Sequence, residues 1–335
     1  MLRHFFSLSV LLLTVSTLTH RANADDADHK LRPDAHAPIG VMRDHVHDAG
    51  EFMVSYRLGY MSMEGNRNGD SRVSNQQVLN NYMVAPTKMP MRMHMFGAMY
   101  GVTDQLTVGV MGGFGEKEMD HVRRNGTNFE MNNDGILDTK VNAMYQFYKD
   151  DMHRFQFNAG ISLPTGSVDD RKPNNGIFAY PMQMGSGTYD LMPGISYSGQ
   201  THHWSWGSQA NAVLPLGRND RGYSFGNQYQ LTGWGARRFG NIFSASLRLE
   251  GQSWDNVNGY DRELSGPNFM APPMDSSLQG GERITTHIGL NAVIPEGILK
   301  GQRLAAEFGM PVYERLDGPR LETDYRFTLG LQYTF

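Results

Sequence analysis

The last ten residues of the chain, Arg326 to Phe335, alternate strictly between polar and large apolar side chains. The odd-numbered positions carry Phe, Leu, Leu, Tyr and Phe, and the even-numbered positions carry Arg, Thr, Gly, Gln and Thr. Successive side chains of a β-strand point to opposite sides, so this segment forms a strand with one apolar and one polar face. Such a strand requires an apolar environment on one side and water on the other.

The same alternation recurs along most of the chain. It is clearest between Phe155 and Leu163, where apolar odd-numbered residues interleave with Gln156, Asn158, Gly160 and Ser162. Similar ladders run through 137–147 and 284–294. The predicted strands are 51–63, 91–102, 104–114, 136–148, 153–163, 189–198, 202–214, 227–238, 241–254, 282–294, 302–312 and 322–335.

The connections between these strands alternate in length. Those near 103, 149–152, 199–201, 239–240 and 296–301 are short, whereas those at 64–90, 115–135, 164–188, 215–226, 255–281 and 313–321 are mostly long and rich in Gly, Asn, Asp and Pro. Transmembrane barrels have short periplasmic turns and longer outer loops, a difference that a soluble sandwich has no reason to keep. The pattern predicts an all-β fold over 50–335: a transmembrane antiparallel up-and-down β-barrel of about twelve strands with both termini in the periplasm.

The N-terminus predicts export. Arg3 and His4 precede an apolar run from Phe5 to Leu18 and a small-residue cleavage site at Ala22 to Ala24, so residues 1–24 are a predicted signal peptide. The rest of the chain has nothing near the roughly 18 consecutive apolar residues of a membrane-spanning helix, which leaves strands as the means of crossing a bilayer. The mean hydropathy of −0.47 agrees, because half of each transmembrane strand faces an aqueous lumen.

Composition narrows the possible partners. The chain has 34 Asp and Glu against 30 Lys and Arg, a mildly acidic balance that argues against nucleic acid as a partner. It has no Cys, which suits an oxidising periplasm and excludes disulfides, thiolate metal sites and a lipoprotein anchor.

Polar residues opposite the apolar ladders are predicted to line the lumen and the solute pathway. Glu307 and Arg326, on consecutive strands, are expected to form a salt bridge in the lumen wall, with a ligand contact as the alternative. The charged and imidazole residues assigned to the lumen are Arg57, Arg92, His94, Lys140, Arg248, Glu250, His287, Glu307 and Arg326.

Residues 25–49 form a polar leader, predicted to be either a periplasmic arm or a plug of the lumen. It contains the run Asp44 to Asp48, in which His45 and His47 are spaced to bind divalent copper or zinc. A solvated arm that binds no metal is the competing interpretation.

A second candidate metal segment is Met89 to Met95, where Met occupies every second position. Thioethers suit monovalent copper. This stripe lies opposite Arg92 and His94, so we expect it to face lipid or the outer rim and to act as flexible apolar cover.

Enzymatic motifs are weak. Gly222 to Gly226 matches G-x-S-x-G, which works as a nucleophile elbow only at a strand-to-helix turn and lies here between antiparallel strands. A barrel lipase needs an outward Ser beside a His, and Ser208 has no His close by. The sequence therefore predicts neither an enzyme nor a cofactor.

Several segments resemble a known family of outer-membrane proteins. They are Ala37 to Met42 with the following Asp44-His45, Gly50-Glu51 and Ser55 to Arg57, then Tyr100 to Asp104, and Gly160 to Ser167. The chain looks like the outer-membrane barrel transporters of the meta-pathway phenol-degradation (MetA) type. These motifs are turns and strand ends, so the resemblance transfers no functional residue.

The resemblance implies a channel or transporter in the Gram-negative outer membrane for small, hydrophobic or aromatic solutes. The terminal aromatic strand is also similar to the last strand of bacterial outer-membrane barrels, whose final Phe marks them for insertion. The implied partners are outer-membrane lipid, a small solute and, through Phe335, the assembly machinery. The alternative function is copper handling by the His and Met segments.

Overall fold

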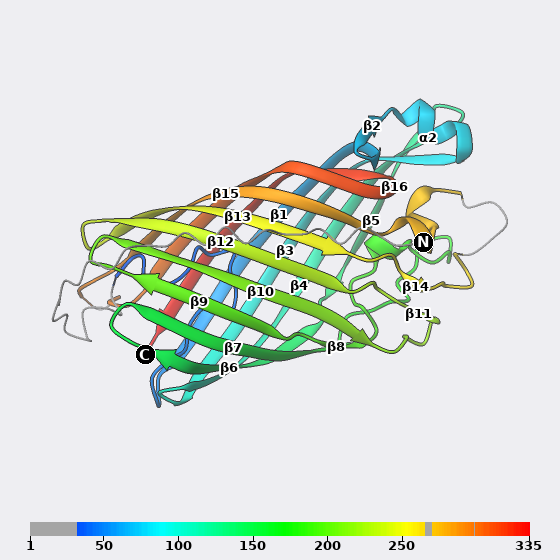
Figure 1. Ribbon diagram of the computed structural model, residues 1–335. Coiled ribbons are helices and arrows are strands. Elements are labelled where there is room, and N and C mark those ends of the chain that lie inside the picture. Colours follow the sequence, from blue (N-terminus) through cyan, green and yellow to red (C-terminus); the bar gives the residue numbers. More distant parts are fainter. Residues whose placement is uncertain (1–31, 265–269, 298) are drawn as a thin grey trace, which may run out of the picture.

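The computed structural model describes residues 32–264, 270–297 and 299–335. The predicted signal peptide and residues 25–31 of the leader lie outside these residues. One antiparallel sheet closes into a barrel with tilted strands (Figure 1). Its strands in order around the wall are β1 (Phe52–Gly69), β3 (Val84–Thr103), β4 (Leu106–Arg123), β6 (Thr139–Lys149), β7 (His153–Leu163), β9 (Gly194–Gln200), β10 (Trp204–Leu216), β12 (Gln228–Phe239), β13 (Phe243–Trp254), β15 (Gly281–Val293) and β16 (Arg303–Thr334).

Strand β16 crosses the wall twice. Its first half, Arg303 to Leu316, pairs with β15, and its second half, Leu316 to Thr334, pairs with β1. The wall is therefore crossed twelve times, which confirms the predicted barrel. The ring is completed where the Phe52 and Phe335 backbones exchange two N–H···O hydrogen bonds of 2.9 Å. Each of the eleven strands that form this ring in the described residues is paired on both sides, as an apolar environment requires.

The predicted strand boundaries are accurate in the middle of the chain and too short near both of its ends. Strand β7 runs from His153 to Leu163 as predicted, whereas β1, β3, β4 and β16 continue into segments predicted as loops, which for β16 is 313–321. Strand β5 (Asn128–Ile136) pairs with the extended part of β4. These extensions carry polar side chains on their outward face, so no apolar ladder marks them in the sequence.

Shorter elements complete the structure. Strand β2 (Ser71–Val73) pairs with β1, and helix α2 (Asn75–Asn81) follows Ser74, whose Oγ accepts a hydrogen bond from Gln77 N at 3.2 Å. Strand β8 (Tyr189–Leu191) is separated from β9 by Pro193, which has no N–H to donate. The others are β11 (Tyr223–Ser224), β14 (Asn258–Gly259) and the 3-10 turns η1 (Tyr180–Met182), η2 (Pro272–Met274) and η3 (Ser276–Leu278).

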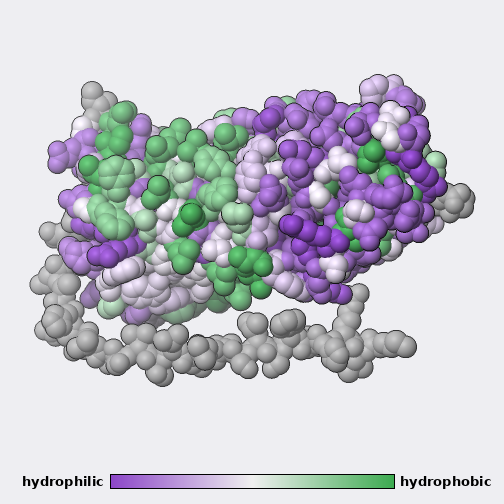
Figure 2. Space-filling view, turned by 90° about the horizontal axis from the view of Figure 1, so that it is seen from above, coloured by the Kyte–Doolittle hydropathy of each residue, from purple (hydrophilic) through white to green (hydrophobic). Residues whose placement is uncertain are grey.

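An apolar belt surrounds one half of the barrel. The outward side chains of β13 to β16 include Ile288, Leu290 and Val312, which are 63%, 65% and 66% exposed. Figure 2 shows the apolar residues gathered over the half that holds the short turns and the C-terminus, while the half with the long loops is hydrophilic. Large apolar side chains exposed in a band fit a lipid bilayer.

None of the helices in the described part of the chain is long and apolar enough to span a membrane.

Candidate functional site in the barrel lumen

Most of the predicted lumen residues point inward. Arg248 and Glu250 on β13, His287 on β15 and Glu307 on β16 are all at most 4% exposed, on the face opposite the apolar belt. The inward-facing members of the predicted set are Arg57, Lys140, Arg248, Glu250, His287, Glu307 and Arg326.

The predictions for Arg92 and His94 are wrong. Arg57 pairs in register with Met95 and Leu58 with His94, so His94 lies on the face opposite Arg57. The His94 Nδ1 atom lies 2.8 Å from the outward Tyr56 hydroxyl, and the exposed Arg92 forms ion pairs of 3.3 Å with Glu116 and Glu118. Beyond the apolar belt the outward face meets water, so polarity there no longer identifies the lumen side.

The methionine stripe of β3 consequently faces inward, which contradicts the expected lipid-facing orientation. Met89 is buried against Met119, Phe178 and Met182, with Met91 packed beside them. Loop residues after β7 thus rest on this stripe inside the barrel. The thioethers serve as packing surface, a role that suits their flexible side chains.

A buried ion network joins three strands of the wall. Arg248 Nη1 donates to Glu250 Oε2 at 2.5 Å, and Arg248 also donates to both carboxylate oxygens of Glu307, with Nε–Oε2 at 3.1 Å. His287 Nδ1 lies 3.1 Å from Glu307 Oε1. Arg326 pairs with Glu250 at 2.9 Å and not with Glu307, so the predicted Glu307–Arg326 bridge is wrong in its partner. Paired in this way, the charges offset the cost of their burial.

A cavity of about 460 Å³ lies in the lumen beside this network. Arg43, Arg57 and Lys140 line it, and none of the three forms an ion pair with a carboxylate among the described residues. Arg283 and Arg326 also reach it, each paired to a glutamate. The methionines Met42, Met53, Met99, Met111 and Met192 line the same cavity.

Residues 32–49 of the leader lie against the lumen wall. Arg303 donates hydrogen bonds of 2.9 and 2.8 Å to the carbonyls of Arg32 and Pro33. The Met42 carbonyl accepts from Gln209 Nε2 at 2.8 Å, and the Arg43 guanidinium donates to the Met192 carbonyl at 2.9 Å. Inward side chains of the wall therefore satisfy backbone groups of the leader.

The leader also brings several titratable groups together. His36, Asp44 and His45 each place one ligand atom so that all three lie within 4.8 Å of one another. The His45 and His47 Nε2 atoms are 3.2 Å apart, and Glu51 Oε2 lies 3.1 Å from His47 Nδ1. This cluster lines a cavity of about 710 Å³ at the barrel end that holds Phe335.

The protonation of this cluster follows from its burial. Burial lowers the pKa of His36 well below its usual range. Burial and the neighbouring His45 lower the pKa of His47 to about 4, although Glu51 opposes the shift. Burial alone would raise the pKa of Asp44, but the charge of His45 and its hydrogen bond outweigh it and bring the pKa to about 2. At neutral pH, His36 and His47 are neutral and Asp44 is ionised.

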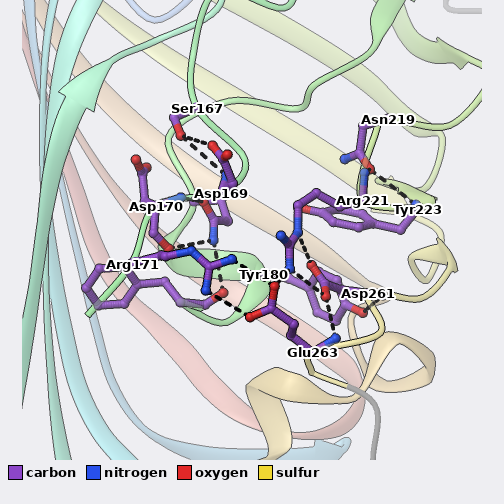
Figure 3. A network of polar contacts seen from close by, with 12 residues as sticks. Ser167, Asp169, Asp170, Arg171, Tyr180, Asn219, Arg221, Tyr223, Asp261 and Glu263 are labelled. Atoms are coloured by element: carbon purple, nitrogen blue, oxygen red, sulfur yellow. Dashed lines mark hydrogen bonds and ion pairs between the residues drawn. The ribbon is translucent and has the colours of Figure 1, made fainter. Parts of the chain in front are cut away.

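Loops join over the opposite end of the barrel (Figure 1), and Figure 3 shows the polar contacts between them. Arg221 pairs with Asp261 at 2.6 Å and with Glu263 at 2.9 Å, and Arg171 pairs with Glu263 at 2.8 Å. The Tyr180 hydroxyl accepts a hydrogen bond from Asp261 N at 2.9 Å. Three loops far apart in sequence are thereby held together, and their apolar core consists of Ile177, Tyr180, Tyr223, Val257 and Leu264. Sequence reasoning missed this network because turn residues carry no periodic signal.

Comparison with solved structures supports the fold. The chain resembles an outer membrane channel from Pseudomonas putida F1 with a TM-score of 0.62 at 11% identity, covering 87% of this chain and 97% of that one. It also resembles the NanC porin (TM-score 0.45, 10% identity, 84% and 98% covered) and a FadL homologue from Pseudomonas aeruginosa (TM-score 0.43, 10% identity, 84% and 90% covered). These last two likenesses are too distant to bear on function. No curated protein matches the sequence.

The barrel, its apolar belt and the Pseudomonas putida likeness together identify a β-barrel of the Gram-negative outer membrane, as predicted. A family model described as "Putative MetA-pathway of phenol degradation" matches residues 88–269, which is more than half of the chain. The chain therefore belongs to this family, which confirms the resemblance seen in its sequence motifs.

Proposed function

We propose that this protein is an outer-membrane channel for small, hydrophobic or aromatic solutes. The observation that carries the proposal is the lumen cavity of about 460 Å³, whose lining combines methionine thioethers with cationic side chains. Its volume lies in the range of small-molecule sites, roughly 300 to 1,000 Å³. The family description links the chain to phenol degradation, which agrees with an aromatic solute.

The chemistry of the cavity suits such a solute. Thioether sulfurs make favourable contacts with aromatic ring edges. Guanidinium groups donate hydrogen bonds to a hydroxyl or carboxylate substituent and stack on ring faces. The contact energies are individually small, so a solute is held without being trapped, as permeation requires.

We propose an orientation with both termini in the periplasm. The short turns and the C-terminus share the end next to the apolar belt, and the long polar loops share the other end. This division agrees with periplasmic turns and outer loops. We further propose that the signal peptide ends at residue 24 and that the 25–49 leader plugs the periplasmic side, where its residues 32–49 lie against the lumen wall. Phe335 would then be available to the assembly machinery during insertion.

Transport is favoured over the alternatives. Ser224 lies on β11, which pairs with β14 in an antiparallel ribbon, and not at a strand-to-helix turn. Met89 and Met91 pack against loop residues inside the barrel. Copper handling by the methionine segment is therefore without support.

Conductance of the purified mature chain in a planar bilayer tests the proposal. We expect discrete openings, and we expect phenol or benzoate to lower the current while it occupies the cavity. Removal of residues 25–49 should raise the conductance, whereas the outward variant Arg92→Gln should leave it unchanged. A silent bilayer for both the full and the leaderless chain would rule out a channel.

A further inference from the structure

We propose that the leader holds a divalent transition-metal ion between His36, His45 and His47, with Asp44 and Glu51 as the carboxylates that orient His45 and His47, and that this ion fastens the leader inside the barrel. The metal site stands on its own geometry and does not depend on what the channel transports.

The donor atoms are already gathered. His36, Asp44 and His45 each bring one ligand atom into a sphere in which all lie within 4.8 Å of one another. The His36 and His45 rings are 3.8 Å apart, and the His45 and His47 rings are 4.7 Å apart, between centroids. The three imidazoles lie within the twelve residues from His36 to His47 and need little rearrangement to surround one ion.

The tautomers dictated by the neighbours direct two lone pairs at each other. Asp44 Oδ1 lies 2.9 Å from His45 Nδ1, and Glu51 Oε2 lies 3.1 Å from His47 Nδ1. When each Nδ1–H donates to its carboxylate, the Nε2 atoms of both rings carry lone pairs, and these atoms are 3.2 Å apart. Two ligand nitrogens on tetrahedral zinc, each bound at about 2.0 to 2.1 Å, are roughly 3.3 Å apart. An ion bound to both Nε2 atoms would therefore remove the repulsion between their lone pairs. The distance between these atoms already matches the one that zinc coordination requires.

A third imidazole has an unused ligand atom. His36 Nδ1 is buried and has no hydrogen-bond partner, which is a costly state for a polar atom. Coordination of a metal ion would give His36 Nδ1 the partner that it lacks. Glu51 would then act as the outer carboxylate that orients a metal-bound histidine, a recurrent arrangement in metal sites.

The donor set selects the class of ion. Three imidazole nitrogens favour zinc or divalent copper over calcium and magnesium, which prefer all-oxygen sites. The ligands face the cavity of about 710 Å³, through which an aqueous ion can reach them.

Binding would close the leader into a loop. The segment between His36 and His45 includes Met42 and Arg43, whose carbonyls accept hydrogen bonds from Gln209 and Gln156 of the wall. A metal that joins both ends of this segment holds its carbonyls at those donors. We expect the bound ion to slow release of the leader.

Zinc titration of the untagged, detergent-solubilised mature chain tests the site. The variants are His36→Ala and His45→Ala, and the matched control is the double variant His202→Ala/His203→Ala. His202 and His203 form an exposed pair with ring centroids 4.5 Å apart, which is the obvious place for adventitious binding. Heat-modifiable gel migration verifies that every variant retains its barrel.

We expect one zinc ion per chain for the wild type and the control, at least hundredfold weaker binding for His36→Ala and His45→Ala, and about 10- to 100-fold weaker binding for Glu51→Gln. Cobalt bound in place of zinc should show the visible absorption of a tetrahedral site, and calcium should not compete. Absence of saturable binding in the wild type, equal binding by His36→Ala and His45→Ala, or loss of binding in the His202/His203 control would each overturn the proposal.

Discussion

Arg248 on β13 reaches across β15 to Glu307 on β16, donating from Nε to Oε2 at 3.1 Å and from Nη2 to Oε1. Both side chains are 2% exposed, and Gly40 of the leader packs directly against them, so that a Cβ at Gly40 would overlap both. The same ion pair thus joins two strands of the wall and contacts the leader at Gly40.

Removing one partner of this pair should destabilise the barrel. Glu307→Gln leaves Arg248 with a weaker acceptor in a buried site, and the expected cost is about 3 to 5 kcal/mol in the free energy of unfolding. Urea titration monitored by heat-modifiable gel migration measures it. Arg92→Gln, on the exposed outward pairs, should change stability by less than about 0.5 kcal/mol. If Glu307→Gln lowers the free energy of unfolding as little as Arg92→Gln does, the Arg248–Glu307 ion pair does not stabilise the barrel.

Enlarging Gly40 should displace the leader while the barrel stays closed. In Gly40→Val the added carbons meet Glu307 and Arg248, and overpacking of this kind costs about 1 to 3 kcal/mol. We expect faster proteolysis within residues 32–49 and larger single-channel conductance, with unchanged gel migration. Gly50→Val is the control, because a Cβ there has open space around it, although its φ of +84° adds local strain. Equal protease resistance of wild type and Gly40→Val would show that the leader does not depend on this contact.

The unpaired cations of the cavity should make the channel anion-selective. Arg43, Arg57 and Lys140 face the cavity without carboxylate partners among the described residues, so they favour anions in transit. Lys140→Gln should lower the chloride-to-potassium permeability ratio by roughly two- to fivefold, as expected for one charge at a water-like dielectric constant, worth about 1 kcal/mol. Reversal potentials across a salt gradient give the ratio. Lys88→Gln, paired outside with Glu64 at 3.1 Å, should have no effect.

The ion pairs of Arg171 and Arg221 that join the loops should persist in mild acid and break in strong acid. Hydrogen bonds from Arg171 and Arg221 lower the pKa of Glu263 to about 2. A carboxylate with a depressed pKa stabilises the folded loops above its unfolded value of about 4.3, and this contribution is lost as pH falls through 2. Limited proteolysis of the loops with pepsin should therefore accelerate between about pH 4 and pH 2. Glu263→Gln should be cleaved faster than wild type already at pH 5, where the wild-type carboxylate is fully ionised.

How much of this could be predicted from the sequence depends on what surrounds each strand. Within the apolar belt, lipid outside and water inside force a period of two, so the bounds of β7 and the inward positions of Arg248, Glu250, His287 and Glu307 follow from alternation alone. Beyond the belt both faces of the wall meet polar surroundings. The predicted inward positions of Arg92 and His94 are wrong there, and the Met stripe of β3 faces inward rather than outward.

The sequence by itself determined that the chain would close into a barrel, because alternating polarity and alternating connection lengths allow no open alternative in a bilayer. Only the tertiary structure decided that Glu250, rather than Glu307, receives Arg326, that Arg171 and Arg221 converge on Glu263, and that the leader gathers His36 beside His45. Strand tilt and register shift every cross-strand neighbour, and these depend on closure of the whole ring rather than on any local run of residues.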